Sequence, residues 1–327
     1  MGEFELIERF FKRPARKSAL GVGDDCALLR PSEGIQLAIS SDMLVEGRHF
    51  LSTVDPRRLG HKALAVNLSD LAACGAEPLG FTLALSLPRA DEAWLGAFAQ
   101  GLFDLADVHD CELIGGDTTQ GPLNICITVF GEVPPGDALL RSHAQAGDDI
   151  YVSGTVGDAR MALEAFRGTL ALDADVFSYA RARMEEPTPR VSLGLALRAI
   201  ANAAIDISDG LLGDLGHILR QSGVGAQIDT HWLHHPMRFQ DQPAGLSPQL
   251  ATLPLNRRLD FALAGGDDYE LCFTAPVNQR ELVHAAAWET HTPITRIGRI
   301  TAEPGLTVLD PNGQVVQRRF SSFDHFG

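Results

Sequence analysis

The sequence predicts a two-domain protein, with an α+β N-terminal domain over residues 1–137 and an α/β C-terminal domain over residues 138–327. The first observation is the length, because 327 residues suffice for about two domains that each bury a core. The second is that the first half holds several alternating strands and two long helical stretches. The third is that helical and strand patterns alternate after residue 147, as is typical of an α/β domain. Between the two halves, Pro134-Pro-Gly-Asp137 has the composition of a linker.

Composition and charge narrow the class of protein. The chain is 45% hydrophobic and 21% charged, as expected of an ordinary soluble protein. Its formal net charge of -15 disfavours nucleic acid and anionic membranes as partners, because both are polyanions. The five cysteines are scattered without a Cys-x-x-Cys pair, which indicates reduced core thiols in a cytoplasmic protein. The sequence shows no leader-like segment and no apolar run of membrane-spanning length, so we expect neither secretion nor membrane insertion.

The elements of the first half follow from the spacing of apolar residues. Helical spacing predicts helices over 4–11, 56–74 and 94–108, and Gly75 ends the second of these. Alternation predicts strands over 35–41, 81–87 and 123–133, and a short strand over 111–114. Glycines in the segment 20–29 predict a strand or tight turn with Asp24 and Asp25 at its tip.

The second half is predicted in the same way. We expect strands over 150–153, 203–207 and 224–228, and another after the turn at 265–268. Helices are expected over 158–166, 175–184, 190–201, 211–222 and 259–264, and Gly223 ends the fourth of these. The segment 231–255 lacks a clear period and is predicted to be a loop.

Acidic residues recur where an apolar strand ends. The strand at 203–207 leads directly into the helix that begins at Leu211, with Asp206, Ser208, Asp209 and Asp214 at the junction. Carboxylates so close together repel one another unless a cation lies among them, so the junction predicts a divalent metal site. Similar glycine- or serine-flanked acids follow other strands: Gly23-Asp24-Asp25, Ser40-Ser41-Asp42, Gly115-Gly116-Asp117 and Gly265-Gly266-Asp267-Asp268.

Asp70 belongs to the same set although it lies within a predicted helix. Its neighbours at helical spacing include Val66, Asn67 and Ala73, so its side chain is expected on an inward-looking face. A buried carboxylate requires a metal or a hydrogen-bonded partner, and a loop-capping acid is the alternative to a metal ligand.

The sequence lacks the motifs that mark several common reaction classes. The chain has no P-loop, no completed dinucleotide fingerprint after Gly21-Val-Gly23, no protein-kinase signature and no Gly-x-Ser-x-Gly. His231, His234 and His235 indicate a polar loop rather than a zinc site. The remaining signal is a dense set of oxygen ligands, which suits Mg²⁺ bound together with substrate phosphates. Phosphoryl transfer is therefore the favoured reaction class, with several ions held at once.

Five segments taken together resemble one known family. They are Gly21-Val-Gly-Asp-Asp-Cys-Ala-Leu-Leu29, Leu64-Ala-Val-Asn-Leu-Ser-Asp-Leu-Ala-Ala73, Ile114-Gly-Gly-Asp-Thr-Thr119, Ile205-Asp-Ile-Ser-Asp-Gly-Leu211 and Gly265-Gly-Asp-Asp-Tyr-Glu-Leu271. On these segments the chain resembles the thiamine-monophosphate kinases of the aminoimidazole-ribonucleotide-synthetase-like superfamily, over nearly its whole length.

The resemblance implies ATP-dependent phosphorylation of thiamine monophosphate to thiamine diphosphate. It implies a homodimer formed through N-terminal domains that bind ATP and Mg²⁺, with the C-terminal domain completing the active-site cleft. The implied Mg²⁺ ligands are Asp25, Ser40, Ser41, Asp42, Asp70, Asp117, Asp206 and Asp209. The implied ATP contacts are Gly116, Asp117, Arg141 and Ser208, and the implied substrate contacts are His49, Asp267 and Phe323.

A direct in-line transfer needs no catalytic side chain as a base. The second pKa of a phosphate monoester is about 6, so the attacking oxygen is already ionised at neutral pH. Two alternatives remain open at this stage. One is another ATP-dependent synthetase of the same superfamily, which activates an amide or a selenide. Selenide activation would need a reactive cysteine near the N-terminus, and none precedes Cys26. The other is a noncatalytic Ca²⁺-binding or scaffold protein, although the chain has no EF-hand loop.

Overall fold

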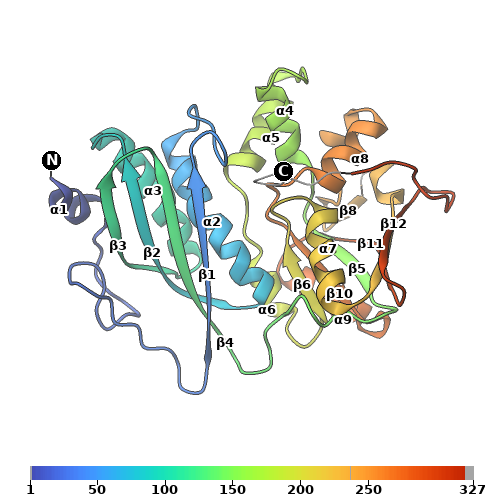
Figure 1. The fold of residues 1–327 in the computed structure, drawn as a ribbon, viewed down its shortest axis with the longest axis horizontal. Coiled ribbons are helices and arrows are strands. Elements are labelled where there is room, and N and C mark those ends of the chain that lie inside the picture. The colour runs from blue at the N-terminus through green and yellow to red at the C-terminus, as the bar shows by residue number, and fades with distance from the viewer. Residues whose placement is uncertain (1, 236, 321–327) are drawn as a thin grey trace. The chain divides into compact units, whose positions relative to one another are not determined.

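The fold is taken from a computed structural model that describes residues 2–235 and 237–320 (Figure 1). The chain divides into two compact units. Unit 1 comprises residues 1–71 and 76–136, and unit 2 comprises residues 72–75 and 137–327. No described helix is both long and apolar enough to cross a membrane.

Unit 1 is a four-stranded sheet with helices packed on one face (Figure 1). Its strands lie in the order β1-β4-β2-β3, where only β2 and β3 run parallel. The elements are α1 (Glu3–Leu6), the π-helical turn η1 (Ile7–Phe11), β1 (Gln36–Val45), α2 (Pro56–Cys74), β2 (Glu77–Leu87), α3 (Glu92–Val108), β3 (Glu112–Gln120) and β4 (Asn124–Val133).

The two faces of the sheet in unit 1 differ in character. Alternate residues of β1 face α2, among them Ser40, whose hydroxyl reaches the helix. Leu37, Ile39 and Met43 occupy the intervening positions and are 40%, 61% and 53% exposed. This exposed side is called the outer face below. It is apolar on β1, although a lone sheet face toward water is normally polar.

Unit 2 is built on a six-stranded mixed sheet in the order β12-β7-β11-β5-β10-β6. Its strands are β5 (Asp149–Ser153), β6 (Ala203–Asp206), β7 (Gly225–Asp229), β10 (Leu271–Ala275), β11 (Ile294–Thr301) and β12 (Gly305–Leu309). Its α-helices are α4 (Asp158–Phe166), α5 (Ala174–Glu185), α6 (Val191–Ala196), α7 (Leu211–Ser222), α8 (Leu255–Ala264) and α9 (Arg280–Glu289). Short 3₁₀ turns are η2 (His231–Leu233), η3 (Leu250–Thr252) and η4 (Val277–Gln279), and β8 (Met237–Phe239) pairs with β9 (Gln242–Ala244).

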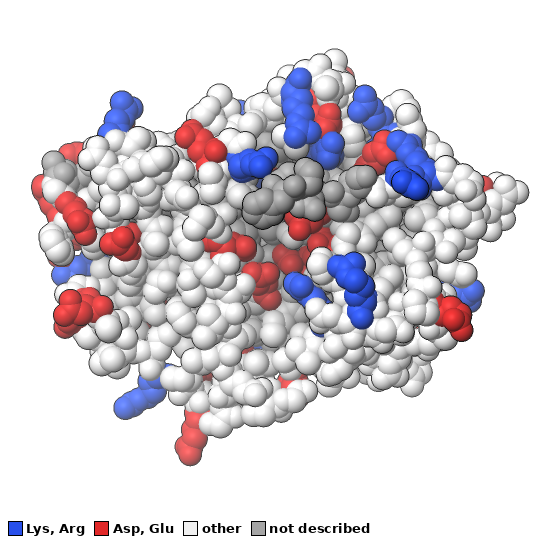
Figure 2. All heavy atoms as spheres, in the orientation of Figure 1, with Lys and Arg blue, Asp and Glu red and all other residues white. Residues whose placement is uncertain are grey.

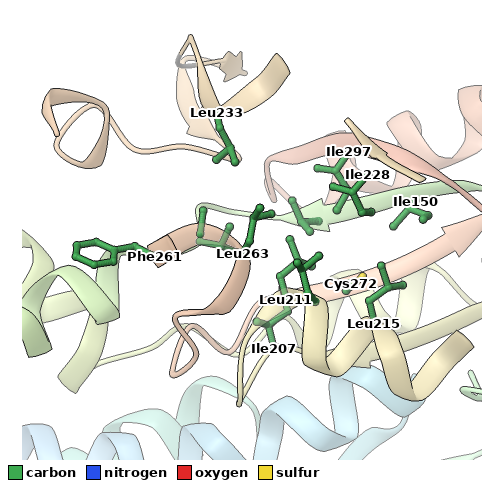
Figure 3. Packing of buried hydrophobic residues seen from close by; sticks show 14 of the residues in the cluster. Ile150, Ile207, Leu211, Leu215, Ile228, Leu233, Phe261, Leu263, Cys272 and Ile297 are labelled. Atoms are coloured by element: carbon green, nitrogen blue, oxygen red, sulfur yellow. The ribbon is translucent and has the colours of Figure 1, made fainter. Parts of the chain in front are cut away.

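The core of unit 2 lies between this sheet and the helices α4, α5, α7 and α8. Figure 3 shows Ile207 and Leu211 among the packed side chains, next to Cys272 of β10. Both residues are fully buried and they flank the segment Ser208–Gly210. The two apolar anchors therefore fix the ends of the turn that carries the acidic residues.

The predicted α+β and α/β classes agree with this architecture, and most helices lie within a few residues of their predicted positions. Two acidic turns were predicted wrongly. β1 does not end at Asp42, because backbone pairing with β4 continues to Val45 and places Asp42 opposite Ile127. Gly115, Gly116 and Asp117 form no turn, since β3 runs through them in parallel with β2.

Other predictions need smaller corrections. The helix expected over 190–201 ends at Ala196, and the loop expected over 231–255 contains the hairpin β8–β9. For the segment 20–29, predicted as a strand or tight turn, the structure confirms the turn, which is closed by an isolated bridge between Leu20 and Leu28. All five cysteines are free, but only Cys111 and Cys272 are buried, and Cys26 is exposed.

Candidate functional site

The inner side of the sheet in unit 1 brings together β1 and the C-terminal half of α2. The hydroxyl of Ser40 donates to Asp70 Oδ2 at 2.5 Å. The backbone N–H of Asp42 donates to Asn67 Oδ1 at 3.1 Å, and Asn67 Nδ2 donates to the carbonyl of Ala63 one turn earlier. Hydrogen bonds from two adjacent turns of α2 thus fix β1 where Ser40 and Asp42 lie.

Asn67 was expected only as a neighbour of Asp70, and this role was not predicted. Asn67 could have been recognised from its spacing, because a polar residue three positions before Asp70 lies on the same helix face.

A pocket of about 540 Å³ in unit 1 gathers other predicted residues. Asp25, Gly116 and Asp117 line it together with Phe4 of α1 and Ile7 of η1. A Cβ at Gly116 would lie 1.8 Å from the carbonyl oxygen of Leu83, so only glycine lets the two strands approach here. The lining of the pocket therefore combines carboxylates with apolar side chains. These apolar side chains were not predicted as part of a site.

Glu112 holds the segment that leads to this pocket. Its carboxylate accepts backbone N–H groups from Arg16 at 2.5 Å and Ser18 at 2.8 Å, and also the Ser18 hydroxyl at 2.8 Å. Burial alone would raise the pKa of Glu112, but the donated N–H groups hold the pKa below its usual value. Sequence analysis missed Glu112, although an acid at the start of an otherwise apolar strand was a usable signal.

Ser41 and His49 lie apart from the Ser40–Asp70 pair. The Ser41 side chain is on the outer face, where its hydroxyl donates to the Ile127 carbonyl at 3.2 Å and lies 3.0 Å from Thr128 Oγ1. His49 Nδ1 accepts the backbone N–H of Val45 at 3.0 Å, within the turn that follows β1. The metal role of Ser41 and the substrate role of His49 stay predictions.

In unit 2 the strand-to-helix junction has the predicted form. Asp206 ends β6 and is 5% exposed, whereas Ser208 and Asp209 are partly exposed. Asp214 in the first turn of α7 reaches back, and its Oδ2 accepts the N–H groups of Asp209 at 3.1 Å and Gly210 at 3.0 Å. Burial, reinforced by the charge of Asp209, raises the pKa of Asp214 to about 7. Asp214 therefore stabilises the turn through hydrogen bonds to the turn's own backbone.

The segment Gly265–Glu270 packs directly against this turn. The N–H of Asp267 donates to the carbonyl of Ser208 at 2.7 Å, and the N–H of Tyr269 donates to that of Ile207 at 2.9 Å. Asp267 and Tyr269 have φ values of 64° and 50°, which are strained for residues with side chains. The hydrogen bonds thus hold Asp267 beside Ser208 in a conformation that local preference opposes. Such strain is enriched at functional sites.

Buried hydrogen bonds and ion pairs hold the same segment, Gly265–Glu270, in place. Asp268 accepts the N–H of Gly157 at 2.9 and 3.0 Å, and burial raises the pKa of Asp268 well above its usual value. Glu270 is fully buried and lies 2.8 Å from Arg183 and 2.6 Å from Arg190. Burial alone would raise the pKa of Glu270, but these two arginines keep it below its usual value. Asp268 and Glu270 therefore anchor the segment, whereas Asp267 is partly exposed.

Arg141 is exposed, and its carbonyl accepts the hydroxyl of Ser222 at the end of α7. The pKa of His217 on α7 is lowered by burial and then by the charges of Arg220 and Arg141. Arg141 thus lies along α7. Phe323 falls outside the described residues.

The structure brings the predicted residues together in three places. Ser40, Asp42 and Asp70 meet between β1 and α2; Asp25, Gly116 and Asp117 meet at the unit 1 pocket; and Asp206, Ser208, Asp209 and Asp267 meet at the edge of unit 2. Within the described part of the chain, no three Asp, Glu, His or Cys side chains are grouped closely enough to hold a metal by themselves. Among the described residues on the face in Figure 2, basic side chains form only small separate groups.

Comparison with known proteins gives the family. The AIR synthase related protein N-terminal domain matches residues 23–133, and the corresponding C-terminal domain matches residues 145–311. A thiamine-monophosphate kinase from Escherichia coli O157:H7 is 48% identical over 330 aligned positions, covering 99% of this chain and 98% of the relative. The chain belongs to the thiamine-monophosphate kinase family.

Solved structures agree with this membership. The crystal structure of thiamine-monophosphate kinase from Stenotrophomonas maltophilia K279a is 46% identical, with a TM-score of 0.83 and 96% of each chain covered. A structure described as AaThiL complexed with AMPPCP and TMP is 29% identical, with a TM-score of 0.74 and coverage of 91% of this chain and 89% of that chain. The family confirms the resemblance and the two-domain fold inferred from the sequence.

Proposed function

We propose that this chain transfers the γ-phosphoryl group of ATP to thiamine monophosphate, forming thiamine diphosphate and ADP. The observation that carries the proposal is identity of nearly half of all positions, over nearly the full length, to a thiamine-monophosphate kinase. Binding of AMPPCP and TMP by the related AaThiL supports the same pair of substrates here.

The donor set of the site fits Mg²⁺. All predicted ligands present carboxylate, hydroxyl or backbone oxygen, which a hard cation prefers. Mg²⁺ commonly takes only one or two protein carboxylates and completes its shell with water and phosphate, which accords with the absence of a three-residue cluster among the described residues. When bound, it neutralises and aligns the phosphates.

We assign Asp25, Ser40, Asp42, Asp70, Asp117, Asp206 and Asp209 to the binding of Mg²⁺. Ser41 is assigned through its backbone oxygen alone, because its hydroxyl lies on the outer face.

The residues of the chain then bind and orient the two substrates. The backbone at Gly116, together with Arg141 and Ser208, would contact ATP, because N–H, guanidinium and hydroxyl groups all donate to phosphate oxygens. His49, Asp267 and Phe323 would contact thiamine monophosphate. The attacking phosphate oxygen is already ionised at neutral pH, so we assign no general base and propose in-line transfer without a phosphoenzyme.

We also propose that the protein is a homodimer joined through unit 1. The outer face of its sheet exposes Leu37, Ile39 and Met43 in one row on β1. A second copy of the same apolar row is the self-complementary partner that a two-fold dimer requires.

The activity is tested with purified full-length protein, ATP, Mg²⁺ and thiamine monophosphate. Chromatography should detect thiamine diphosphate and ADP in equal amounts, and neither product should form in EDTA. Asp209→Asn should lose activity by at least about 100-fold, whereas the exposed control Asp175→Asn should not. ADP without thiamine diphosphate would contradict the proposal.

A further inference from the structure

Unit 2 contains a second pocket, of about 360 Å³, that shares no residue with the predicted active site. It lies where α9, the start of β11, the turn η2 and Met237 of β8 meet. Its polar lining includes Asp229, His231, Arg280, His284 and Arg296. Pockets of this size accept small ligands with a few oriented polar groups.

An arginine pair is the polar centre of this pocket. Arg280 donates to Asp149 through Nε at 2.5 Å and Nη2 at 3.0 Å, and Arg296 donates to Asp149 through Nη1 at 3.2 Å. Burial alone would raise the pKa of Asp149, but the two arginines hold it below its usual value. The buried carboxylate is thus ionised and fixes both guanidinium groups in place.

Both arginines keep capacity for another anion. Their side chains are 44% and 56% exposed, and a guanidinium presents more N–H donors than one shared carboxylate can accept. Asp229 is the other acid in the lining, and its Oδ1 accepts the backbone N–H of His231 at 2.7 Å. The Asp229 carboxylate is therefore already hydrogen-bonded to the backbone of the turn that follows it.

The rest of the wall is aromatic and apolar. Tyr151 stacks on Phe273 with ring centroids 5.1 Å apart, and Met237 is 44% exposed. Trp232 Nε1 and Thr295 Oγ1 are buried and have no hydrogen-bond partner among the described residues. Burying a polar group without a hydrogen-bond partner is unfavourable. If these side chains only stabilised the fold, we would expect both polar atoms to have hydrogen-bond partners.

We propose that this pocket binds a small organic phosphate at a second site. The phosphoryl group would lie on Arg280 and Arg296, with an aromatic or other flat body against the exposed side chains of Met237 and His284. Tyr151 and Trp232 also line the pocket, but they are only 1% and 2% exposed. Two guanidinium groups and the imidazoles of His231 and His284 provide donors in several directions. The three terminal oxygens of a phosphoryl group use such a set more fully than the two oxygens of a carboxylate.

Calorimetric titration of the full-length protein with phenyl phosphate tests the proposal. Saturating AMPPCP and Mg²⁺ are present, so that the predicted nucleotide site is occupied. Arg296→Gln removes one donor group while Arg280 keeps both of its bonds to Asp149. The matched control is Arg299→Gln, an exposed arginine on the same strand that donates to Gln227. Thermal melting checks that both variants are folded.

We expect Arg296→Gln to weaken phenyl phosphate binding by about tenfold or more, and Arg299→Gln to leave the affinity unchanged. Inorganic phosphate and benzoate should each bind more weakly than phenyl phosphate. Equal affinity of both variants, or no binding by the natural chain once AMPPCP is bound, would overturn the site. Equal binding of inorganic phosphate or benzoate would overturn the assigned ligand class.

Discussion

Asp70 shows how one buried carboxylate is retained in a helix. Its side chain accepts the Ser40 hydroxyl, so a hydrogen bond from another element offsets part of the desolvation cost. Ser40 and Asp70 are distant in sequence, and helical spacing alone gave the direction of Asp70 without giving its partner.

Asp70→Asn should lower turnover by at least about 100-fold, because the amide loses the charge that a cation requires. The amide can still accept the Ser40 hydroxyl, so the melting temperature should stay within a few degrees of the natural value. Steady-state kinetics and thermal melting measure the two effects. Asp107→Asn, which alters an exposed ion pair with Arg13, is the control. Near-normal turnover in Asp70→Asn would remove Asp70 from the proposed metal ligands.

Asp214 makes stability depend on pH. Its pKa is raised in the folded state to about 7, so the folded chain binds the proton more tightly than the unfolded chain. The associated stability is present at low pH and is lost as the pH rises through about 7. Asp214→Asn keeps an acceptor for the N–H groups of Asp209 and Gly210 but does not titrate.

We therefore expect the natural chain to lose on the order of 2 kcal/mol relative to Asp214→Asn between pH 5 and pH 8. Urea unfolding at several pH values in EDTA measures the difference. Parallel pH profiles for the two proteins would show that Asp214 is not the titrating group.

At the scale of elements, the parallel pair β2–β3 depends on one glycine. Gly116 has φ 149°, and its Cα faces the carbonyl oxygen of Leu83. Gly116→Ala should destabilise the protein by about 3 kcal/mol or more, since the new methyl group must push the strands apart. Gly115→Ala should cost far less, because its Cβ would lie 4.0 Å from the nearest atom, Thr82 Cγ2. Urea unfolding of both variants provides the comparison, and equal losses would contradict this account.

The same pair explains which elements the sequence could predict. Helices such as α2, α3 and α7 were predicted well, because apolar spacing and the glycines Gly75 and Gly223 mark them locally. The segment Gly115–Asp117 was predicted to be a turn because glycine followed by acid is a local turn signal. Its actual conformation is decided by Leu83, more than thirty residues away.

At the scale of the whole molecule, the acidic residues of the site could be predicted from the sequence, but most of the hydrogen bonds that hold them in place could not. Acid and glycine motifs identified Asp206, Asp209 and Asp267 directly. The backbone bonds that join Asp267 to Ser208, and the bonds that Glu112 accepts from residues 16–18, depend on tertiary contacts that no local pattern encodes. The bonds that Asp214 accepts are local, from Asp209 and Gly210.

Oligomeric state tests the outer face of unit 1. Ile39→Asp places a charge in the exposed apolar row on β1, so we expect the natural dimer to become a monomer. Val108→Asp is the control, because Val108 is 75% exposed on α3 and outside that row. Light scattering during gel filtration measures both masses. A dimer that survives in Ile39→Asp, or a natural chain that is already monomeric, would contradict the assignment.

The last turn of α2 belongs to unit 2 although the rest of the helix belongs to unit 1. The carbonyl of Cys74 accepts the N–H of Leu139, and Gly75 accepts a bond from Arg198. Gly194 approaches Ala72 so closely that a Cβ would lie 2.0 Å from the Ala72 carbonyl oxygen. Cleavage after Gly136 would therefore divide unit 2, because residues 72–75 would stay on the N-terminal fragment together with unit 1. The piece beginning at residue 137 would lack the helical turn on which α6 rests.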